Sequence, residues 1–475
     1  MCKIVSLVLY FSALHSIPEM MTKTILKTAY QILEKSILYH KGEPIGTVAA
    51  LSSPDLAAAN YEECFIRDFV PSALVFLSDG RTDIVRNFLK TVLTLRTRER
   101  TVAGHEIQPG VMPASFRVTE TDEGEILQAD FGEKAIGRVA PVDSMMWWVI
   151  LLYIYTESTG DKELAKSEEF QSTLRQILHL CLKDSFEVSP ALLVPDACTM
   201  IDRRMGIYGH PLEIQSLFYA VLRVTHHLLD KQPTRRQGET DILDTAISRQ
   251  SALQNYVRIF YWLDMERLNE IHRYTTEQFG TDSVNVLNIY PESIPNWVTD
   301  WLPDQCGYLV GNIGPSRMDF RLFTLGNLIA VMFGLATDVQ SEKIIRLYES
   351  RWDDLIGSMP VKIIYPAMEG LEWQVRTGSD PKNVPWSYQN GGNWPALLWP
   401  FVAAALKTGR GDLAERAFQV AISRLSFDNW PEYYDSKTGR LIGRRANMQQ
   451  VWSATSVILS HKLLEDPELL KLLPK

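Results

Sequence analysis

Two short segments far apart in the chain each place one acidic residue among aromatic residues, arginines and glycines. Asp202 stands in IDRRMG (residues 201–206), and Glu432 stands in WPEYYD (residues 430–435). Glycoside hydrolysis needs two carboxyl groups, because one acid protonates the leaving oxygen while the other activates water or attacks the sugar. Aromatic rings beside them would offer faces to the C–H surface of a sugar. The alternative reading is that each acid caps a helix in a polar loop.

Two further places could contact a sugar. Arg67 and Asp68 are adjacent at a predicted helix start, so the guanidinium could donate to one hydroxyl while the carboxylate accepts from another. The alternative is a helix-capping Asp with a neighbouring Arg. Asp143 is either a substrate ligand or the N-cap of its helix, and the adjacent Trp147–Trp148 pair is interpreted as core.

The segment 380–394 combines indoles, a phenol and amides on a backbone that contains two glycines, a mixture typical of a sugar subsite. Its candidate substrate-binding residues are Trp386, Tyr388, Asn390 and Trp394. His210, one of nine histidines, follows Gly209 and is either a packed residue or a substrate contact. Tyr433 and Arg444 complete the set of candidate substrate-binding residues.

Several other classes of chemistry are disfavoured. The chain has no Gly-x-Ser-x-Gly, P-loop or dinucleotide fingerprint, so carboxylates are the plausible catalytic groups and no cofactor is expected. Its five cysteines are scattered without Cys-x-x-Cys or zinc spacing, which predicts reduced thiols in a cytoplasmic protein without a metal. The net charge of −9 comes without long runs of like charge, which argues against a nucleic-acid partner. No stretch after the N-terminus is apolar for the roughly 18 residues that a membrane span needs.

The elements that must position these residues are predicted to be helices. At residues 212–229 the apolar positions recur at intervals of three and four, and strand signals are sparse elsewhere. Three tight connections each pair a C′ glycine with an Asp N-cap: Gly80 with Asp83, Gly160 with Asp161, and Gly409 with Asp412. Long segments centred near residues 60, 120, 203, 300, 380 and 438 alternate with these turns.

This alternation predicts an all-α toroid of six helical hairpins, with the long loops forming a funnel at one end. An open solenoid is the rival, but it would show a repeated sequence motif. The helices after the long segments are expected to start near Phe69, Asp143, Pro211, Asp319, Pro395 and Met448. Their partners are expected to start near Thr22, Asp83, Asp161, Ala246, Val339 and Leu413.

The chain of 475 residues is expected to hold a single barrel domain at residues 22–475, preceded by an extension at residues 1–21. An apolar run at residues 4–14 imitates a signal peptide, but its cleavage site is poor. Met20 and Met21 offer other translation starts. An untranslated extension, a flexible tail and an export signal all stay open.

From residue 22 to residue 467 the sequence resembles the neutral/alkaline invertases of plants and cyanobacteria, glycoside hydrolase family 100. The matching strings are FIRDFVPSAL (65–74), MPASF (112–116), AIGRVAPVDS (135–144), IDRRMG (201–206), SIP (293–295), DPKN (380–383) and WPEYYD (430–435). The sequence departs from the family pattern at Met145–Met146, at His210, where Tyr is commoner, and at Gln389, where His is usual.

The resemblance implies an (α/α)6 barrel that hydrolyses sucrose to glucose and fructose without a metal, as a homo-oligomer in the cytosol or an organelle. It places the general acid at Asp202 and the catalytic base at Glu432. The Arg67–Asp68 pair resembles the glucose clamp of other α/α-barrel glucosidases, such as glucoamylases. The leading hypothesis is therefore an inverting sucrose hydrolase. The alternatives are a glucosidase or phosphorylase of the same barrel class acting on another disaccharide, and a non-catalytic sugar-binding scaffold.

Overall fold

The structure is a computed structural model, and its description covers most of the chain. The described residues are 18–52, 61–97, 100–102, 105–133, 141–182, 189–194, 200, 208–231, 241–274, 285–314 and 317–474. Asp202, with the whole of residues 201–207, lies outside them, as do residues 1–17.

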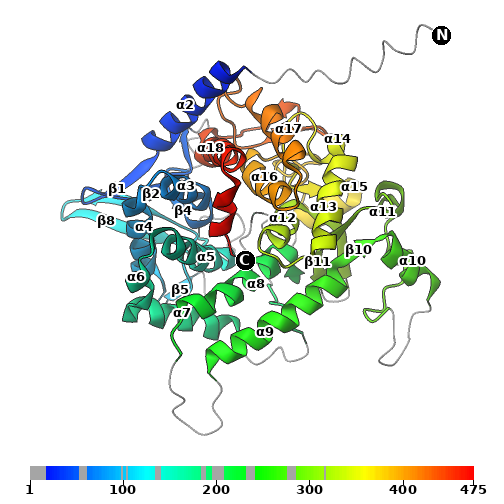
Figure 1. Cartoon of the computed structure of the whole chain (residues 1–475), viewed down its shortest axis with the longest axis horizontal. Helices are drawn as coiled ribbons and strands as arrows, with labels where there is room; N and C mark the ends of the chain where they lie inside the picture. Colours follow the sequence, from blue (N-terminus) through cyan, green and yellow to red (C-terminus); the bar gives the residue numbers. More distant parts are fainter. Residues whose placement is uncertain are drawn as a thin grey trace.

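In the part of the chain that the structure describes, helices pack in a closed ring, each contacting the next and the last contacting the first (Figure 1). In ring order they are α3 (Ile66–Ser78), α5 (Val142–Thr159), α8 (Leu212–Leu228), α12 (Thr324–Met332), α16 (Leu398–Lys407) and α18 (Val451–Glu465). These helices are apolar on nearly every side, as a helix enclosed by other elements must be. Trp147 and Trp148 in α5 are buried, which confirms their interpretation as core residues.

A second set of helices lies outside the ring (Figure 1). They are α2 (Glu19–Lys35), α4 (Thr82–Leu95), α6 (Lys162–Lys166), α7 (Glu168–Cys181), α9 (Ile242–Tyr256), α13 (Asp338–Ser350) and α17 (Gly411–Ile422). They are amphipathic: α4 buries Ile84, Val85, Phe88, Leu89 and Val92 along one face. One apolar stripe therefore packs on the ring while the other face meets solvent.

The predicted turn chemistry is confirmed in part. Gly80, Gly160 and Gly409 all have φ near +74°, the left-handed conformation that ends a helix. Asp161 is the N-cap of α6 and accepts from the backbone N–H of Leu164. Asp83 and Asp412 instead lie inside the first turns of α4 and α17, where a carboxylate still faces the positive end of the helix dipole.

The long connecting segments contain short antiparallel strands that the helical pattern did not predict. One sheet joins β10 (Trp262–Asp264), β11 (Gly307–Gly314), β12 (Arg317–Phe323) and β13 (Ile364–Tyr365), with β9 (His210–Pro211) also paired to β11. A second joins β4 (Cys64–Phe65), β7 (Ser115–Thr121) and β8 (Gly124–Asp130). The two-stranded pairs are β1 (Ile37–His40) with β2 (Glu43–Thr47), β3 (Ala50–Ser52) with β16 (Met448–Gln450), β5 (Arg100–Val102) with β6 (His105–Ile107), and β14 (Tyr434–Asp435) with β15 (Leu441–Ile442).

Short helices complete these connections. They are α10 (Met265–Arg273), α11 (Asn296–Trp301), α14 (Trp352–Leu355), α15 (Gly370–Thr377), the π-helix Val257–Tyr261, and the 3-10 helices Pro291–Ser293, Pro395–Leu397 and Pro467–Leu472.

One predicted helix start is wrong. Asp319 was expected near the start of a helix, but it lies in strand β12, and α12 begins at Thr324. Met318, Phe320 and Leu322 alternate with polar residues, and this period of two is typical of a strand. The other predicted helices start within a few residues of the observed ones. The six-hairpin count and the funnel stay predictions.

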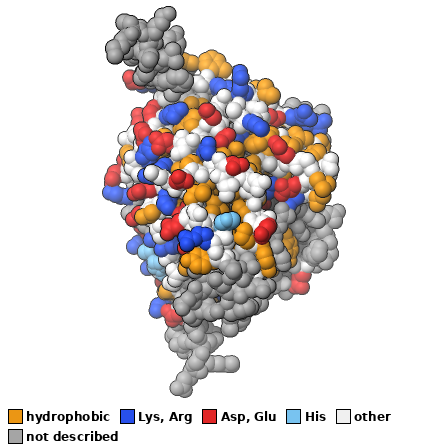
Figure 2. Space-filling model, turned by 90° about the vertical axis from the view of Figure 1, so that its right-hand side faces the viewer, with side chains coloured by type: hydrophobic (Ala, Val, Ile, Leu, Met, Phe, Trp, Pro, Cys, Tyr) orange, Lys and Arg blue, Asp and Glu red, His pale blue; other side chains and the backbone are white. Residues whose placement is uncertain are grey.

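The part of the surface coloured in Figure 2 shows no large area of one sign. Figure 2 shows acidic and basic side chains interspersed over the visible face. No helix in the described ranges is long and apolar enough to cross a bilayer.

Candidate active site

The Glu432 side chain is buried, only 2% exposed, and polar side chains surround its carboxylate. The Tyr61 hydroxyl donates to its Oε1 over 2.9 Å, and the Asn447 side-chain amide donates to its Oε2 over 3.1 Å. The Asn447 backbone N–H also donates to Oε2, at 3.4 Å, and the Lys382 ammonium lies 3.9 Å from the same oxygen. Donors on both oxygens hold this carboxylate in one orientation, as a catalytic group requires.

Tyr61 acts as a neutral hydrogen-bond donor. Burial raises the pKa of its hydroxyl well above the usual value of 10.0, and the nearby Glu432 carboxylate raises it further. The hydroxyl therefore keeps its proton throughout the physiological range.

The first turns of α3 and α5 bring the predicted clamp together. Arg67 Nη1 donates to Asp143 Oδ2 over 2.7 Å, and Arg67 Nε lies 3.7 Å from Asp68 Oδ1. Asp143 is therefore a first-turn residue paired with Arg67, and the Pro141 position is the N-cap. Asp68 Oδ1 is buried and has no hydrogen-bond partner among the described residues. An acceptor left in this state suits a ligand hydroxyl.

Burial raises the pKa of Asp68 to about 7, and the carboxylates of Glu432 and Asp143 raise it while Arg67 opposes them. Burial is also the main cause of the raised pKa of Asp143, with Arg67 again opposing it. The Glu432 carboxylate is therefore near enough to Asp68 for its charge to favour the protonated form of Asp68. Several carboxyl groups with perturbed pKa values in one place are typical of a catalytic centre.

Glu213, in the first turn of α8, belongs to the same cluster and was missed by the sequence analysis. It is 3% exposed, and burial, followed by the Asp143 carboxylate, raises its pKa to about 7. Its Oε1 accepts from the backbone N–H of Met200 over 3.1 Å. An acid in the first turn of a largely apolar helix is the sequence signal that could have found it.

Met200 is anchored from two sides. Glu213 binds its N–H, and the side-chain amide of Gln389 donates to its carbonyl over 3.1 Å. Asp202 follows two positions later in the sequence. The chain therefore enters the segment that carries Asp202 from a residue fixed against this carboxylate cluster.

The aromatic residues of the 380–394 segment have different surroundings. Tyr388 is half-buried, with the Lys382 ammonium 3.9 Å from its ring centroid and the Tyr433 ring 5.1 Å away. Trp394 stacks on Tyr433 at 5.5 Å, and both are buried. Trp386 faces a different group: its Nε1 donates to Glu369 over 2.7 Å, and its ring lies beside Tyr365.

Strained backbone surrounds the cluster. Trp386, Tyr388 and Trp430 all have positive φ, at +65°, +46° and +56°. Bulky side chains rarely adopt this conformation, which costs about 1–3 kcal/mol at each position and is concentrated at functional sites.

Two other predicted substrate contacts, Asn390 and His210, use side-chain polar atoms within the protein, and a third, Arg444, is exposed. The buried Asn390 amide accepts from Met368 N–H and donates to the carbonyls of Met368 and Asn383. The half-buried His210 ring bonds to the Ile313 carbonyl at 2.9 Å through Nδ1, and burial lowers its pKa. Arg444 has an exposed side chain, while its backbone carbonyl accepts from the Tyr433 hydroxyl.

Among the described residues, no group of three or more His, Cys, Asp and Glu side chains is arranged to hold a metal ion.

The chain is similar to proteins of one known family. A family model described as alkaline and neutral invertase matches residues 29–467. The chain is 50% identical to neutral/alkaline invertase 1, mitochondrial, of Oryza sativa subsp. japonica, over 94% of this chain and 72% of that protein. It is 48% identical to cytosolic invertase 1 of the same plant, over 96% of this chain and 80% of that protein.

Solved structures show the same fold. A glycoside hydrolase family 63 mannosylglycerate hydrolase from Thermus thermophilus has a TM-score of 0.53 at 11% identity, over 92% of this chain and 100% of that chain. A bacterial glucoamylase complexed with acarbose has a TM-score of 0.51 at 12% identity, over 94% of this chain and 57% of that chain. At these identities the likeness shows the fold alone. The family match and the identity to the plant invertases establish that the chain belongs to the alkaline and neutral invertase family and is a glycoside hydrolase.

Proposed function

We propose that this protein hydrolyses sucrose to glucose and fructose with inversion, using Asp202 as general acid and Glu432 as general base. The observation that supports it best is the buried Glu432 carboxylate, fixed on both oxygens beside the Arg67–Asp68 pair, in a chain of the invertase family. The relatives' names point to sucrose as the substrate.

The reaction breaks the bond between the anomeric carbon of glucose and the bridging oxygen. Asp202 donates its proton to that oxygen, which leaves with fructose, while Glu432 takes a proton from the attacking water. Water attacks the opposite face of the glucose ring, so the α-linkage of sucrose becomes β-glucose. This requires a separation of roughly 6.5–9.5 Å between the two carboxyl groups, which leaves room for the water molecule.

Glucose would be held at the first turns of α3 and α5. The unpartnered Asp68 Oδ1 accepts from a sugar hydroxyl, and Arg67, oriented by Asp143, donates to another. Tyr388 offers its half-buried ring to the sugar. Trp394, Tyr433 and Asn390 support this surface from behind, because their polar atoms bond to backbone groups.

A sugar panel tests the substrate. Reducing-sugar release from sucrose, raffinose, maltose and trehalose should be confined to sucrose, because the galactose of raffinose blocks the glucose 6-hydroxyl held by the clamp. Equal cleavage of maltose or trehalose would support a glucosidase, and dependence on phosphate would support a phosphorylase. Binding without release of sugars would support a non-catalytic scaffold.

Product analysis tests the mechanism. Proton NMR should show β-glucose first, and hydrolysis in ¹⁸O-labelled water should place the label on glucose. Initial α-glucose would assign Glu432 as a nucleophile in a retaining mechanism, and label on fructose would remove glucose from the clamp.

We also propose that the protein acts in the cytoplasm as a homo-oligomer, without a nucleic-acid or membrane partner. The relatives include cytosolic, mitochondrial and chloroplastic proteins. Light scattering of the purified protein would report its mass, and a monomer would contradict the proposed assembly.

A further inference from the structure

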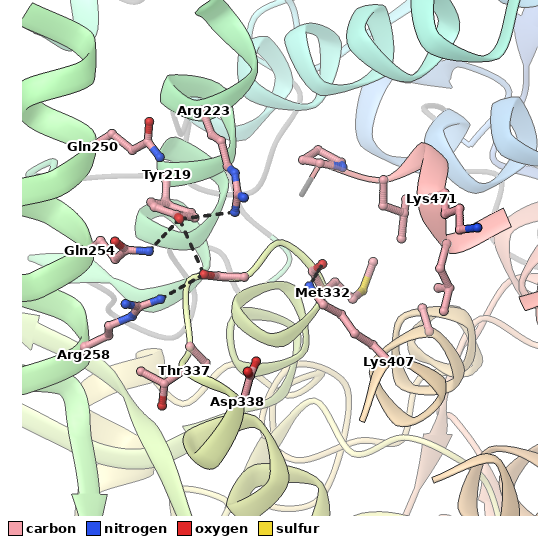
Figure 3. A pocket seen from close by; sticks show the side chains of 16 residues that line it. Tyr219, Arg223, Gln250, Gln254, Arg258, Met332, Thr337, Asp338, Lys407 and Lys471 are labelled. Atoms are coloured by element: carbon pink, nitrogen blue, oxygen red, sulfur yellow. Dashed lines mark hydrogen bonds between the residues drawn. The ribbon is translucent and has the colours of Figure 1, made fainter. Parts of the chain in front are cut away.

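Figure 3 shows a cavity of about 770 Å³ among the helices of the ring. It is lined by residues near the carboxyl ends of α8, α12 and α16, whereas the candidate active site uses the first turns of α3, α5 and α8. Along α8 the Glu213 and Arg223 positions are separated by ten residues, or about 15 Å of helix. The cavity is therefore distinct from the catalytic site.

Positive charge gathers in this cavity although the chain as a whole carries a net charge of −9. Its described lining includes Arg223, Arg258, Lys407 and Lys471, and Asp338 is the single acidic side chain among these described residues. Lys471 pairs with the exposed Glu468, so its charge is matched locally. Among the described residues, none of the other three cations forms an ion pair within 4.0 Å.

These three cations also donate hydrogen bonds to backbone carbonyls at the carboxyl end of α12 and just after it, and Figure 3 shows part of this arrangement. Lys407 Nζ donates to the Met332 carbonyl over 2.8 Å, and Arg223 Nη1 donates to the Phe333 carbonyl over 3.1 Å. Arg258 donates Nε to the Leu335 carbonyl over 2.7 Å and Nη2 to the Gly334 carbonyl over 3.2 Å. Capping the end of a helix is therefore one role of this cluster.

Capping does not balance the charge. The carboxyl ends of α8, α12 and α16 together carry about 1.5 negative charges, and Asp338 adds one more, against two half-buried arginines and the exposed Lys407. A small positive excess of about half a charge therefore remains among the described lining residues. Burial lowers the pKa of Lys407, and the Arg223 charge lowers it further, as expected for a cation without a matching anion.

We propose that this cavity binds a small phosphorylated sugar, with its phosphate held by Arg258, Arg223 and Lys407. Guanidinium groups pair with phosphate oxygens through parallel N–H donors, and the described carbonyl contacts of Arg258 use two of its five donors. Gln250 and Gln254 line the same cavity and offer amide groups to sugar hydroxyls (Figure 3).

The size and lining agree with this class of ligand. Small-molecule pockets measure about 300–1,000 Å³, so the cavity has room for a phosphorylated hexose. Tyr219 is the sole aromatic residue among the described lining residues, and its hydroxyl is already bound by Gln254. The described lining therefore provides little surface on which a nucleotide base could stack.

Isothermal titration of the full chain at low salt, with fructose 1,6-bisphosphate as the probe, tests the proposal. We expect saturable binding with one site per chain, absent with fructose at the same concentration. Arg258→Gln and Lys407→Gln should each weaken binding by about tenfold or more, because each removes a charged donor. Thermal unfolding of each variant shows whether it is folded, and having two variants keeps the test usable if one of them does not fold.

Two controls separate this cavity from other sites. Arg351→Gln removes an arginine that likewise donates to a backbone carbonyl, that of Trp301 at 2.7 Å, outside the cavity, and it should bind the probe as the wild type does. Asp68→Asn alters the catalytic clamp and should also leave binding unchanged. No saturable binding, or equal binding by the wild type and both cavity variants, would overturn the proposal. Binding of inorganic phosphate as tight as that of the sugar phosphate would overturn its sugar component.

Discussion

At the scale of single residues, the main feature is that Glu432 depends on distant partners for its orientation. Tyr61 lies 371 positions away in sequence and bonds to one oxygen, while Asn447 bonds to the other. A base that activates water must present one oxygen at a fixed place. In the proposed mechanism the two donors would therefore position the base without contacting the sugar themselves.

Tyr61→Phe should lower kcat by about tenfold, because hydrogen bonds to charged groups are worth about 1.5–3 kcal/mol and Asn447 retains part of the orientation. Steady-state kinetics near neutral pH would measure this effect. Tyr30→Phe, which removes a peripheral hydroxyl near Asp79, is the matched control and should leave kcat unchanged. An unaltered kcat in Tyr61→Phe would remove Tyr61 from this role.

Asp202→Asn should reduce sucrose hydrolysis by about 10³-fold, within the range for loss of a general acid. The loss should be much smaller with α-glucosyl fluoride, because fluoride leaves without a proton. Asp68→Asn provides the contrast: its loss should be similar with both donors, because it binds the sugar and does not protonate the leaving group. Single-turnover rates with the two donors would decide the matter, and equal losses for Asp202→Asn would contradict its assignment as the acid.

Local sequence revealed some of these residues and concealed others. The Arg67–Asp68 pair and Glu432 stand in unusual polar strings, so they could be proposed directly, and the structure places them in one cluster. The contacts of Glu432 with Tyr61, Asn447 and Lys382 could not be predicted. These residues lie outside the string that contains Glu432, and a local sequence pattern does not show which distant residues meet in the fold. Asn390 and Trp394 were proposed from composition, which cannot show that their polar atoms bond to backbone groups.

At the scale of elements, the 380–394 segment is fixed mainly by side chains that bond to backbone. Asn390 closes it against Met368 and Asn383 through three hydrogen bonds. Helices could be predicted because apolar residues recur with their period. Strands such as β3 and β16 could not, because they pair across some 400 residues, whereas β12 carried a local alternation that the helical interpretation passed over.

Asn390→Ala should lower the free energy of unfolding by about 2–4 kcal/mol, because it leaves the buried N–H and carbonyl of Met368 unsatisfied, while the Asn383 carbonyl keeps its bond from Trp373. Urea unfolding followed by circular dichroism would measure this loss. Asn269→Ala is the matched control, since the exposed Asn269 amide also donates to a backbone carbonyl, and its effect should stay below about 0.5 kcal/mol. A stable Asn390→Ala variant with a raised KM would instead support a direct role in sugar binding.

At the scale of the whole molecule, the ring encloses several carboxyl groups that resist ionisation. Burial raises the pKa of Glu213 from 4.5 to about 7, and that of Asp68 from 3.8 to about 7. A raised pKa in the folded state means that the folded state binds protons more tightly than the unfolded chain. Their contribution to stability is therefore complete below about pH 4 and is lost as the pH rises through 7.

Glu213→Gln should reduce this pH dependence. The amide can still accept from Met200 N–H but has no charge to bury, so the variant should gain stability over wild type between pH 5 and pH 8 by on the order of 1 kcal/mol or more. Urea unfolding at the two pH values would test it. Glu169→Gln, at a half-exposed position on α7, should show no such change. Parallel wild-type and Glu213→Gln curves would contradict the burial of this charge.

The closed ring also determines when the enzyme becomes active during its synthesis. Helix α18 contacts both α2 and α3. The hydrogen bond between Tyr61 and Glu432 joins the segment before α3, the first helix of the ring, to the segment before α18, the last. A nascent chain that has emerged only as far as α17 contains the sugar clamp but neither Glu432 nor the helix that closes the circle. Such a chain can fold helical hairpins one after another, yet it cannot cleave its substrate. Catalytic competence should therefore arise in a single late step, when α18 docks between α16 and α3.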